Sequence, residues 1–273
     1  MSDETTMPEP AELQETVFAA LQDKARLPVA TMVVLGVLAG AYIGIGGLFA
    51  TVALTGADAL PYGAGQVLAG LVFATGLALV IIAGAELFTG NTMMTGAVLA
   101  RKISALQAVK ALAIVYAANF AGSLVLAMLV FGAGVHGAGD GALGRAALEL
   151  GRTKTENGFL SVLASGILAN MLVCLAVWSA YAGRTTSQKL AGLILPVAAF
   201  VAAGLEHSVA NMYLLPYALM VQSLGEAGGS LSVAGILGNI VPATIGNIIG
   251  GSLIACAYWV AYGAAETGKA GQS

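Results

Sequence analysis

The sequence predicts an all-α membrane protein: a six-span bundle built from an inverted three-span repeat, with spans two and five broken. Three observations predict it, namely a scarcity of charge, six long apolar runs, and a polar motif that occurs twice. Of the 273 residues, 58% are hydrophobic and only 9% are charged, and the mean hydropathy is +0.89. Soluble domains carry about 25% charged residues, so most of this chain is expected to be solvated by lipid.

Six apolar runs are each long enough for the roughly 20 residues that cross a bilayer. They cover residues 28–55, 66–100, 105–133, 158–182, 190–222 and 231–263. The connections are expected at a turn (56–65), a basic turn at Arg101 and Lys102, a Gly-rich polar stretch (134–157), a second basic turn (Arg184 to Lys189) and a Gly/Ser turn (223–230). We expect a single transport domain over 28–263, flanked by a cytoplasmic segment (1–27) and a cytoplasmic tail (264–273). Within the first segment, residues 11–24 fit an amphipathic surface helix.

The basic residues predict the orientation, because Lys and Arg concentrate on the cytoplasmic side. With the N-terminus inside, eight of the eleven face the cytoplasm, and the three that face out are Arg145, Arg152 and Lys154. An even number of spans places both termini in the cytoplasm. The net charge of −3 argues against a nucleic-acid partner.

The long second and fifth runs contain the same motif. Residues 83–91 read AGAELFTGN and residues 203–211 read AGLEHSVAN, which pairs Glu86 with Glu206 and Asn91 with Asn211. A weaker echo links ANFAGSL (118–124) to GNIIGGSL (246–253). The chain therefore divides into halves of three spans, about 28–133 and 158–263. Because three is odd, the second half must enter the membrane from the opposite side, as in an inverted repeat.

A polar break inside a membrane survives where it lines a cavity or is buried in protein. Inverted halves bring two breaks together near the midplane, where half-helix N-termini favour an anion. A second interpretation assigns the paired Glu and Asn residues to capping the freed backbone amides, and it is compatible with a pore lining. His207 lies inside the second break, and a titratable group at that depth predicts a functional site. His136 is expected in the outer loop, in contact with solvent.

At these motifs the sequence resembles the formate/nitrite transporter family. The resemblance is carried by AELFTGNTM (85–93), GILANMLVCLAVW (166–178), EHSVANMY (206–213) and IVPATIGNIIGG (240–251), and it extends over residues 28–263. It implies an aquaporin-like fold with six helices per protomer, and a homopentamer in which each protomer has its own pore. It also implies small monovalent anions as substrates (formate, nitrite, or hydrosulfide in one branch) and the inner (plasma) membrane of a prokaryotic cell.

The resemblance also implies roles for single residues. His207 matches the pore histidine, Thr89 the threonine that hydrogen-bonds near it, and Lys154 the lysine that draws anions into the outer vestibule. Glu206 and Asn170 match neighbours that support the histidine and the polar wall. The remaining candidates are an outer constriction (Leu77, Phe73, Phe200), an inner constriction (Leu87, Phe88), and Asn239 or Asn247 as the polar residue of the last helix. Thr31 stands where formate channels of the family have a lysine, which favours the nitrite branch slightly.

These roles lead to a mechanism. A bare anion pays a large desolvation penalty in an apolar constriction, so we expect Lys154 to concentrate the anion and a proton to reach it from or through His207. The neutral acid would then pass Leu77 or Phe88.

Two other classes of protein share some of these features. An aquaporin-type channel for neutral solutes would usually show Asn-Pro-Ala motifs, and neither break contains proline. A membrane enzyme is not expected, because Gly-x-Ser-x-Gly, His-Glu-x-x-His and paired intramembrane Asp are all absent from the sequence. No cofactor and no metal are expected.

Overall fold

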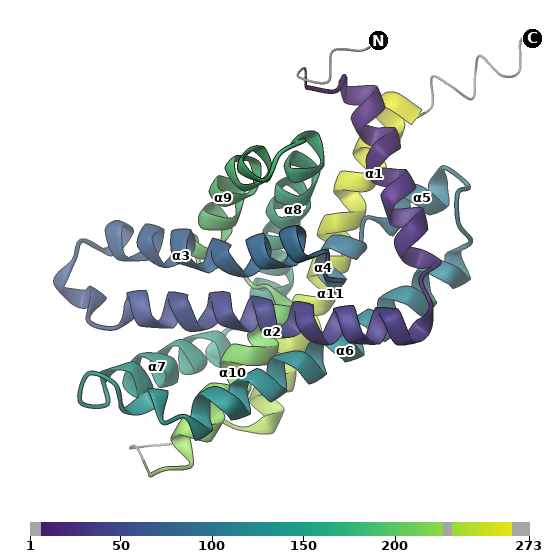
Figure 1. Ribbon diagram of the computed structural model, residues 1–273. Helices are drawn as coiled ribbons and strands as arrows, with labels where there is room; N and C mark the ends of the chain where they lie inside the picture. Colours follow the sequence, from purple (N-terminus) through teal and green to yellow (C-terminus); the bar gives the residue numbers. More distant parts are fainter. Residues whose placement is uncertain (1–6, 226–230, 264–273) are drawn as a thin grey trace, which may run out of the picture.

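The structure is a computed structural model, and it describes residues 7–225 and 231–263. These residues form a helical bundle (Figure 1). The predicted tail (264–273) and part of the predicted turn (226–230) lie outside the described residues. In chain order the elements are α1 (Pro10–Ala25), α2 (Val29–Leu54), η1 (Ala57–Ala59), α3 (Tyr62–Ala83), α4 (Phe88–Asn91), α5 (Met94–Leu99), α6 (Ala105–Gly132), η2 (Val135–Gly137), α7 (Ala142–Glu156), α8 (Phe159–Ala182), α9 (Thr186–Ala202), α10 (Ser208–Gln222), α11 (Val233–Tyr258) and the π-helical turn η3 (Trp259–Gly263).

Among the described residues, five helices are long and apolar enough to cross a bilayer: α2, α3, α6, α8 and α11 with η3. α9 is a shorter apolar helix. α2 packs against α6 and α3, and α8 packs in the same way against α11 and α9. Helices in a membrane can approach each other closely where the residues at their contact are small. At Gly40 an added Cβ would overlap the backbone of Asn119 in α6, so the α2–α6 contact requires glycine there.

The ends of α3 and α9 have a common local cause. α3 ends at Gly84, whose φ of +74° is left-handed, and the turn after α9 contains Gly204 at +68°. L-residues with a side chain rarely adopt this conformation, and glycine does so without strain. In both turns the next amide bonds back into the helix, from Ala85 to Val80 O and from Leu205 to Phe200 O. The Ala-Gly pair of the repeated motif is therefore a helix-ending signal.

Residues 10–25 form a helix, as expected for the amphipathic segment, and its apolar side packs on the bundle. The buried side chains of α1 include Phe18, whose ring meets that of Trp178 edge-on at 6.2 Å. The helix of the second apolar run, α3, begins at Tyr62, before the predicted start at residue 66.

The Gly-rich stretch 134–157, predicted as a connection, also contains a helix that was not predicted, the 15-residue α7. Leu143, Ala147, Gly151 and Lys154 are buried, at spacings of three and four residues that place them on one face. Because the stretch is rich in glycine and charged residues, this pattern is hard to recognise in the sequence. The helix becomes favourable when its buried face packs against α10.

Candidate functional site

The site lies where the two non-helical connectors, 84–87 and 203–207, lead into α4 and α10. Figure 1 shows α4 at the centre of the bundle, next to the end of α3. Thr89 belongs to α4, and His207 is the N-cap residue of α10. Thr89 Oγ1 and His207 Nε2 are 2.9 Å apart, and both residues are buried. The fold thus joins two residues that are 118 positions apart in the chain.

The hydrogen bonds of His207 determine where its ring proton lies. The amide of Ala210 donates to His207 Nδ1 at 3.0 Å, which closes the first turn of α10. A nitrogen that accepts cannot carry the proton of a neutral imidazole. Neutral His207 therefore carries its proton on Nε2 and donates it to the hydroxyl of Thr89. Adding a second proton to Nδ1 would remove the cap of the helix.

Aromatic rings continue from the histidine toward α3. The ring of Phe200 stacks on His207 with centroids 5.7 Å apart, and Phe73 meets Phe200 edge-on at 5.6 Å. Phe88 packs instead on Tyr116, at 4.7 Å. The structure therefore brings Phe73 and Phe200 together beside the imidazole, as an apolar wall.

A buried ion pair flanks the histidine. Lys154 Nζ of α7 lies 2.9 Å from Glu206 Oε2, and the exposed fractions of the two side chains are 11% and 3%. Asn211 Nδ2 donates to the same carboxylate oxygen at 2.6 Å, and it also donates to Asn239 Oδ1 at 2.7 Å. Asn239 in turn donates to the carbonyl of Lys154. Lys154 is thus held both through its side chain and through its backbone.

The first half of the chain repeats this arrangement. Lys24 of α1 donates to Glu86 Oε1 at 2.5 Å, and Asn91 Nδ2 donates to Glu86 Oε2 at 2.8 Å. The Lys24 side chain is more exposed, at 24%. Sequence reasoning missed Lys24 as a site residue. A signal was present, because Lys24 precedes Lys154 by 130 positions, which is also the separation of Gly36 and Gly166, whose carbonyls accept equivalent hydrogen bonds.

Two further asparagines cap the backbone at the breaks. Asn119 Oδ1 accepts from the amide of Phe88, while its Nδ2 donates to Gly36 O and Glu86 O. Asn247 does the same for Ser208, donating to Gly166 O and Glu206 O. The capping that the sequence allowed for Glu86, Glu206, Asn91 and Asn211 is therefore done by Asn119 and Asn247. The carboxylates instead bind lysine.

Asn170 supports the threonine side of the contact. Its Nδ2 donates to Thr89 O at 3.1 Å and to Asn247 O at 2.5 Å. Within residues 7–225 and 231–263, Asn170 Oδ1 and Ser208 Oγ are buried polar atoms that have no hydrogen-bond partner. Buried polar atoms are normally paired, so these two leave hydrogen-bonding capacity unused beside the Thr89–His207 contact.

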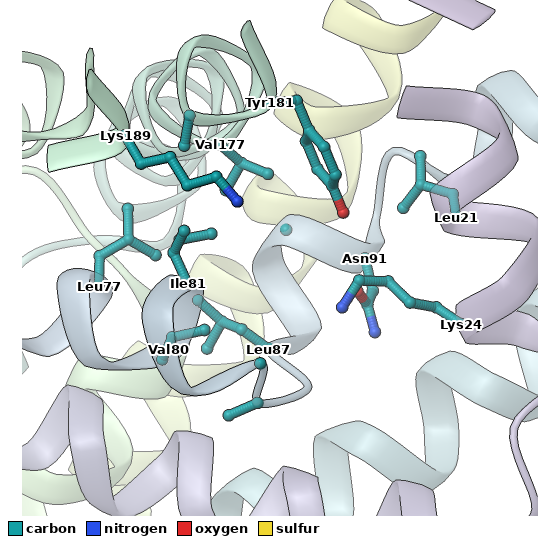
Figure 2. A pocket seen from close by; sticks show the side chains of 14 residues that line it. Leu21, Lys24, Leu77, Val80, Ile81, Leu87, Asn91, Val177, Tyr181 and Lys189 are labelled. Carbon is teal, nitrogen blue, oxygen red and sulfur yellow. The ribbon is translucent and has the colours of Figure 1, made fainter. Parts of the chain in front are cut away.

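Each of the two connectors, 84–87 and 203–207, borders a cavity. The α1-side cavity has a volume of 180 Å³, and its walls include Leu77, Leu87, Lys24 and Lys189 (Figure 2). The α7-side cavity is larger, at 1140 Å³, and is lined by Lys154, Gly204 and Glu206 among others. Leu77, predicted beside Phe73 and Phe200, thus lines the same cavity as Leu87.

A metal site does not emerge from the described part of the chain, where no three His, Cys, Asp or Glu side chains gather around one point. The polar groups at the centre are instead one imidazole, hydroxyls and carboxamides. Such groups can donate hydrogen bonds to a small anion or accept them from its conjugate acid.

Comparisons with known proteins agree on one family. A model described as formate/nitrite transporter matches residues 11–260. The formate channel FocA of Escherichia coli (strain K12) is 35% identical over 242 residues, 84% of this chain and 85% of that protein. A probable formate transporter of Methanothermobacter thermautotrophicus is 36% identical over 273 aligned positions, 93% of this chain and 96% of that protein.

Solved structures show the same similarity. A pentameric formate channel with formate bound has a TM-score of 0.76 at 35% identity, and the match covers 86% of this chain and 97% of that chain. A structure described as an FNT family ion channel has a TM-score of 0.77 at 32% identity, with coverage of 91% and 98%.

Proposed function

Because the chain belongs to the formate/nitrite transporter family and is a multi-pass membrane protein, we propose that it conducts small monovalent anions of weak acids, with formate as the preferred anion. The two relatives and one of the two solved structures described above are named for formate. The observation that carries the proposal is the Thr89–His207 contact, a buried polar pair formed where two connectors end, each of which borders a lysine-lined cavity.

The proposed membrane architecture has six spans in two inverted halves. α3 with α4 and α5 forms the broken second span, and α9 with α10 forms the broken fifth. This is supported by the matching hydrogen bonds of the two halves, from Lys24 and Glu86 in one and from Lys154 and Glu206 in the other. The chain lies in the inner membrane with α1 on the cytoplasmic side. It assembles as a homopentamer, which is supported by its similarity to a pentameric channel.

The proposed path enters at the α7-side cavity, passes Phe73 and Phe200, reaches His207 and Thr89, and leaves past Leu77 and Leu87. Lys154 attracts the anion, although its charge is partly compensated by Glu206. A bare anion would pay several kcal/mol to enter the apolar segment. Crossing as the neutral acid avoids this penalty.

The proton in this mechanism comes from or through His207. Since Nδ1 is occupied by the amide of Ala210, the proton that faces the path is the one on Nε2. A neutral ring that gave up this proton would become an imidazolate, so the ring must first take a second proton from the water of the cavity at Nδ1, which displaces the amide of Ala210. Nε2 then gives its proton to the anion, and a neutral ring remains. Thr89 accepts from Nε2–H in the resting state, so the anion competes with its hydroxyl.

The test is flux in proteoliposomes. His207→Phe removes both ring nitrogens, and His207→Asn keeps a donor without a proton-exchanging ring. Both are expected to abolish the pH dependence of formate flux, measured at two pH values. His136→Asn is the matched control, because His136 stacks on Phe131 away from this site. If both His207 variants keep the wild-type pH dependence, the histidine does not take part in the mechanism.

The same vesicles test the substrate. Nitrite is the second candidate because of Thr31, and hydrosulfide is a third arm. Faster uptake of nitrite than of formate would reassign the preferred anion. Swelling in glycerol without anion flux would instead indicate a neutral-solute channel.

A further inference from the structure

We propose that the α1-side cavity is an anion-binding subsite in which Lys189 is the binding cation and the hydroxyl of Tyr181 a hydrogen-bond donor. The inference rests on the proposed function, and it gives the path a holding position at its cytoplasmic end. Neither residue belongs to the repeated motif.

The charges of the lining support an anion. Among the residues that the structure describes, Lys24 and Lys189 line the α1-side cavity and no Asp or Glu does so. Lys24 is paired with Glu86, which is not among the lining residues. Among the described residues, the Lys189 side chain has neither a carboxylate within 4.0 Å nor a hydrogen-bond acceptor, so its charge is available to the cavity.

The α7-side cavity differs in this respect. Its lining contains the cations Arg145, Arg152 and Lys154, and also the acids Asp58, Glu149 and Glu206. Positive and negative side chains are therefore equal in number there. The α1-side cavity has an excess of positive charge, so an anion is held more strongly at that end of the path.

Lys189 lines the same cavity as two of the apolar residues of the proposed path, Leu77 and Leu87. Figure 2 shows Lys189 reaching toward the opening from α9, with the Tyr181 hydroxyl facing the same space near Lys24. Leu77 and Leu87 form part of the same walls. An anion beside Lys189 is thus held at the edge of the apolar segment, where it meets the constriction before entering or after leaving it.

The size also fits. A volume of 180 Å³ compares with about 30 Å³ for each water molecule in the liquid. Formate or nitrite fits together with a few waters. These waters keep the anion partly hydrated, so that a single lysine and a single hydroxyl are sufficient partners.

The experiment measures the half-saturating formate concentration from each side, in vesicles of defined orientation. Lys189→Gln is expected to raise the value from the cytoplasmic side about three- to tenfold at low salt, as expected for loss of one nearby charge. The value from the opposite side should change by less than about twofold. The difference should shrink at 1 M salt, where the screening length is about 3 Å.

Three variants make the result specific. Lys189→Arg keeps the charge and should retain the wild-type value, which separates charge from packing. Tyr181→Phe removes only the hydroxyl and should give a smaller increase on the same side. Lys110→Gln, an exposed lysine of α6 outside the cavity lining, is the matched control.

The two proposals fail in different ways. If the wild-type protein conducts formate but Lys189→Gln behaves like Lys110→Gln from both sides, the subsite is refuted and the channel stands. An equal change from both sides also refutes the subsite. If the wild-type protein conducts no formate, nitrite or hydrosulfide, the proposed function fails and the subsite fails with it.

Discussion

The two mirrored ion pairs differ in burial, which predicts unequal effects of removing their lysines. In Lys154→Met the aliphatic chain stays but the ammonium is lost. The Glu206 carboxylate, which is 3% exposed in the unsubstituted protein, then keeps Asn211 alone as a side-chain hydrogen-bond partner among the described residues. Leaving a buried charge without its partner costs about 3–5 kcal/mol. Lys24→Met should cost about half as much, because the exposed fraction of Lys24 is 24% against 11% for Lys154, and water can replace the ammonium there.

The assay is thermal unfolding of the purified protein in detergent. For chains of this size, 1 kcal/mol corresponds to about 2–4 °C in Tm, so Lys154→Met should lower Tm by about 6–20 °C. The double variant Lys154→Met/Glu206→Gln removes both charges and should recover most of the loss. The reasoning is refuted if Lys24→Met lowers Tm as much as Lys154→Met, or if the double variant is no more stable than Lys154→Met alone.

Three further predictions concern the centre of the bundle. Thr89→Val leaves the His207 Nε2–H without its acceptor at 2.9 Å and should cost about 1–3 kcal/mol; Thr89→Ser should restore both Tm and flux, and equal Tm for the two variants would contradict this. Asn247→Ala removes the cap of Ser208 and two donated hydrogen bonds; it should lower Tm and impair flux even though the residue touches no predicted constriction, so unchanged flux would count against it. Gly84 has a φ of +74° and open space around its Cβ position, so Gly84→Ala should cost only about 1–2 kcal/mol. At Gly122 an added Cβ would overlap the backbone of Val37, so Gly122→Ala should prevent folding. Comparable yields of the two folded variants would refute the comparison.

The candidate site could be predicted in part because its residues lie in a motif that occurs twice. The spacing of Glu86 and Asn91 is the same as that of Glu206 and Asn211, and the structure uses both pairs in the same way. Lys24 was missed because it precedes the first apolar run, in a segment that composition separates from the bundle. The pairing of Lys24 with Glu86 depends on how α1 folds back onto the bundle.

The roles of Asn239 and Asn247 show a second limit. Both lie on α11, eight positions apart, and the sequence offers no basis for choosing between them. In the structure they have different partners: Asn239 binds Asn211 and the carbonyl of Lys154, while Asn247 caps Ser208. Helical periodicity indicates that both can face the bundle, but not which neighbour each one meets.

By itself the sequence determined that this is a helical membrane protein with two related halves, and it indicated where two of its helices end. Those features follow from local physics, since lipid requires apolar runs with satisfied backbones and Ala-Gly ends a helix through a left-handed glycine. The contact of Thr89 with His207 was expected from the family resemblance. Only the tertiary structure decided that Asn119 and Asn247 supply the caps, and that Lys189 lines a cavity whose described lining has no carboxylate. Each of these facts depends on which helices pack side by side, and the contacts that decide it join residues distant in the chain.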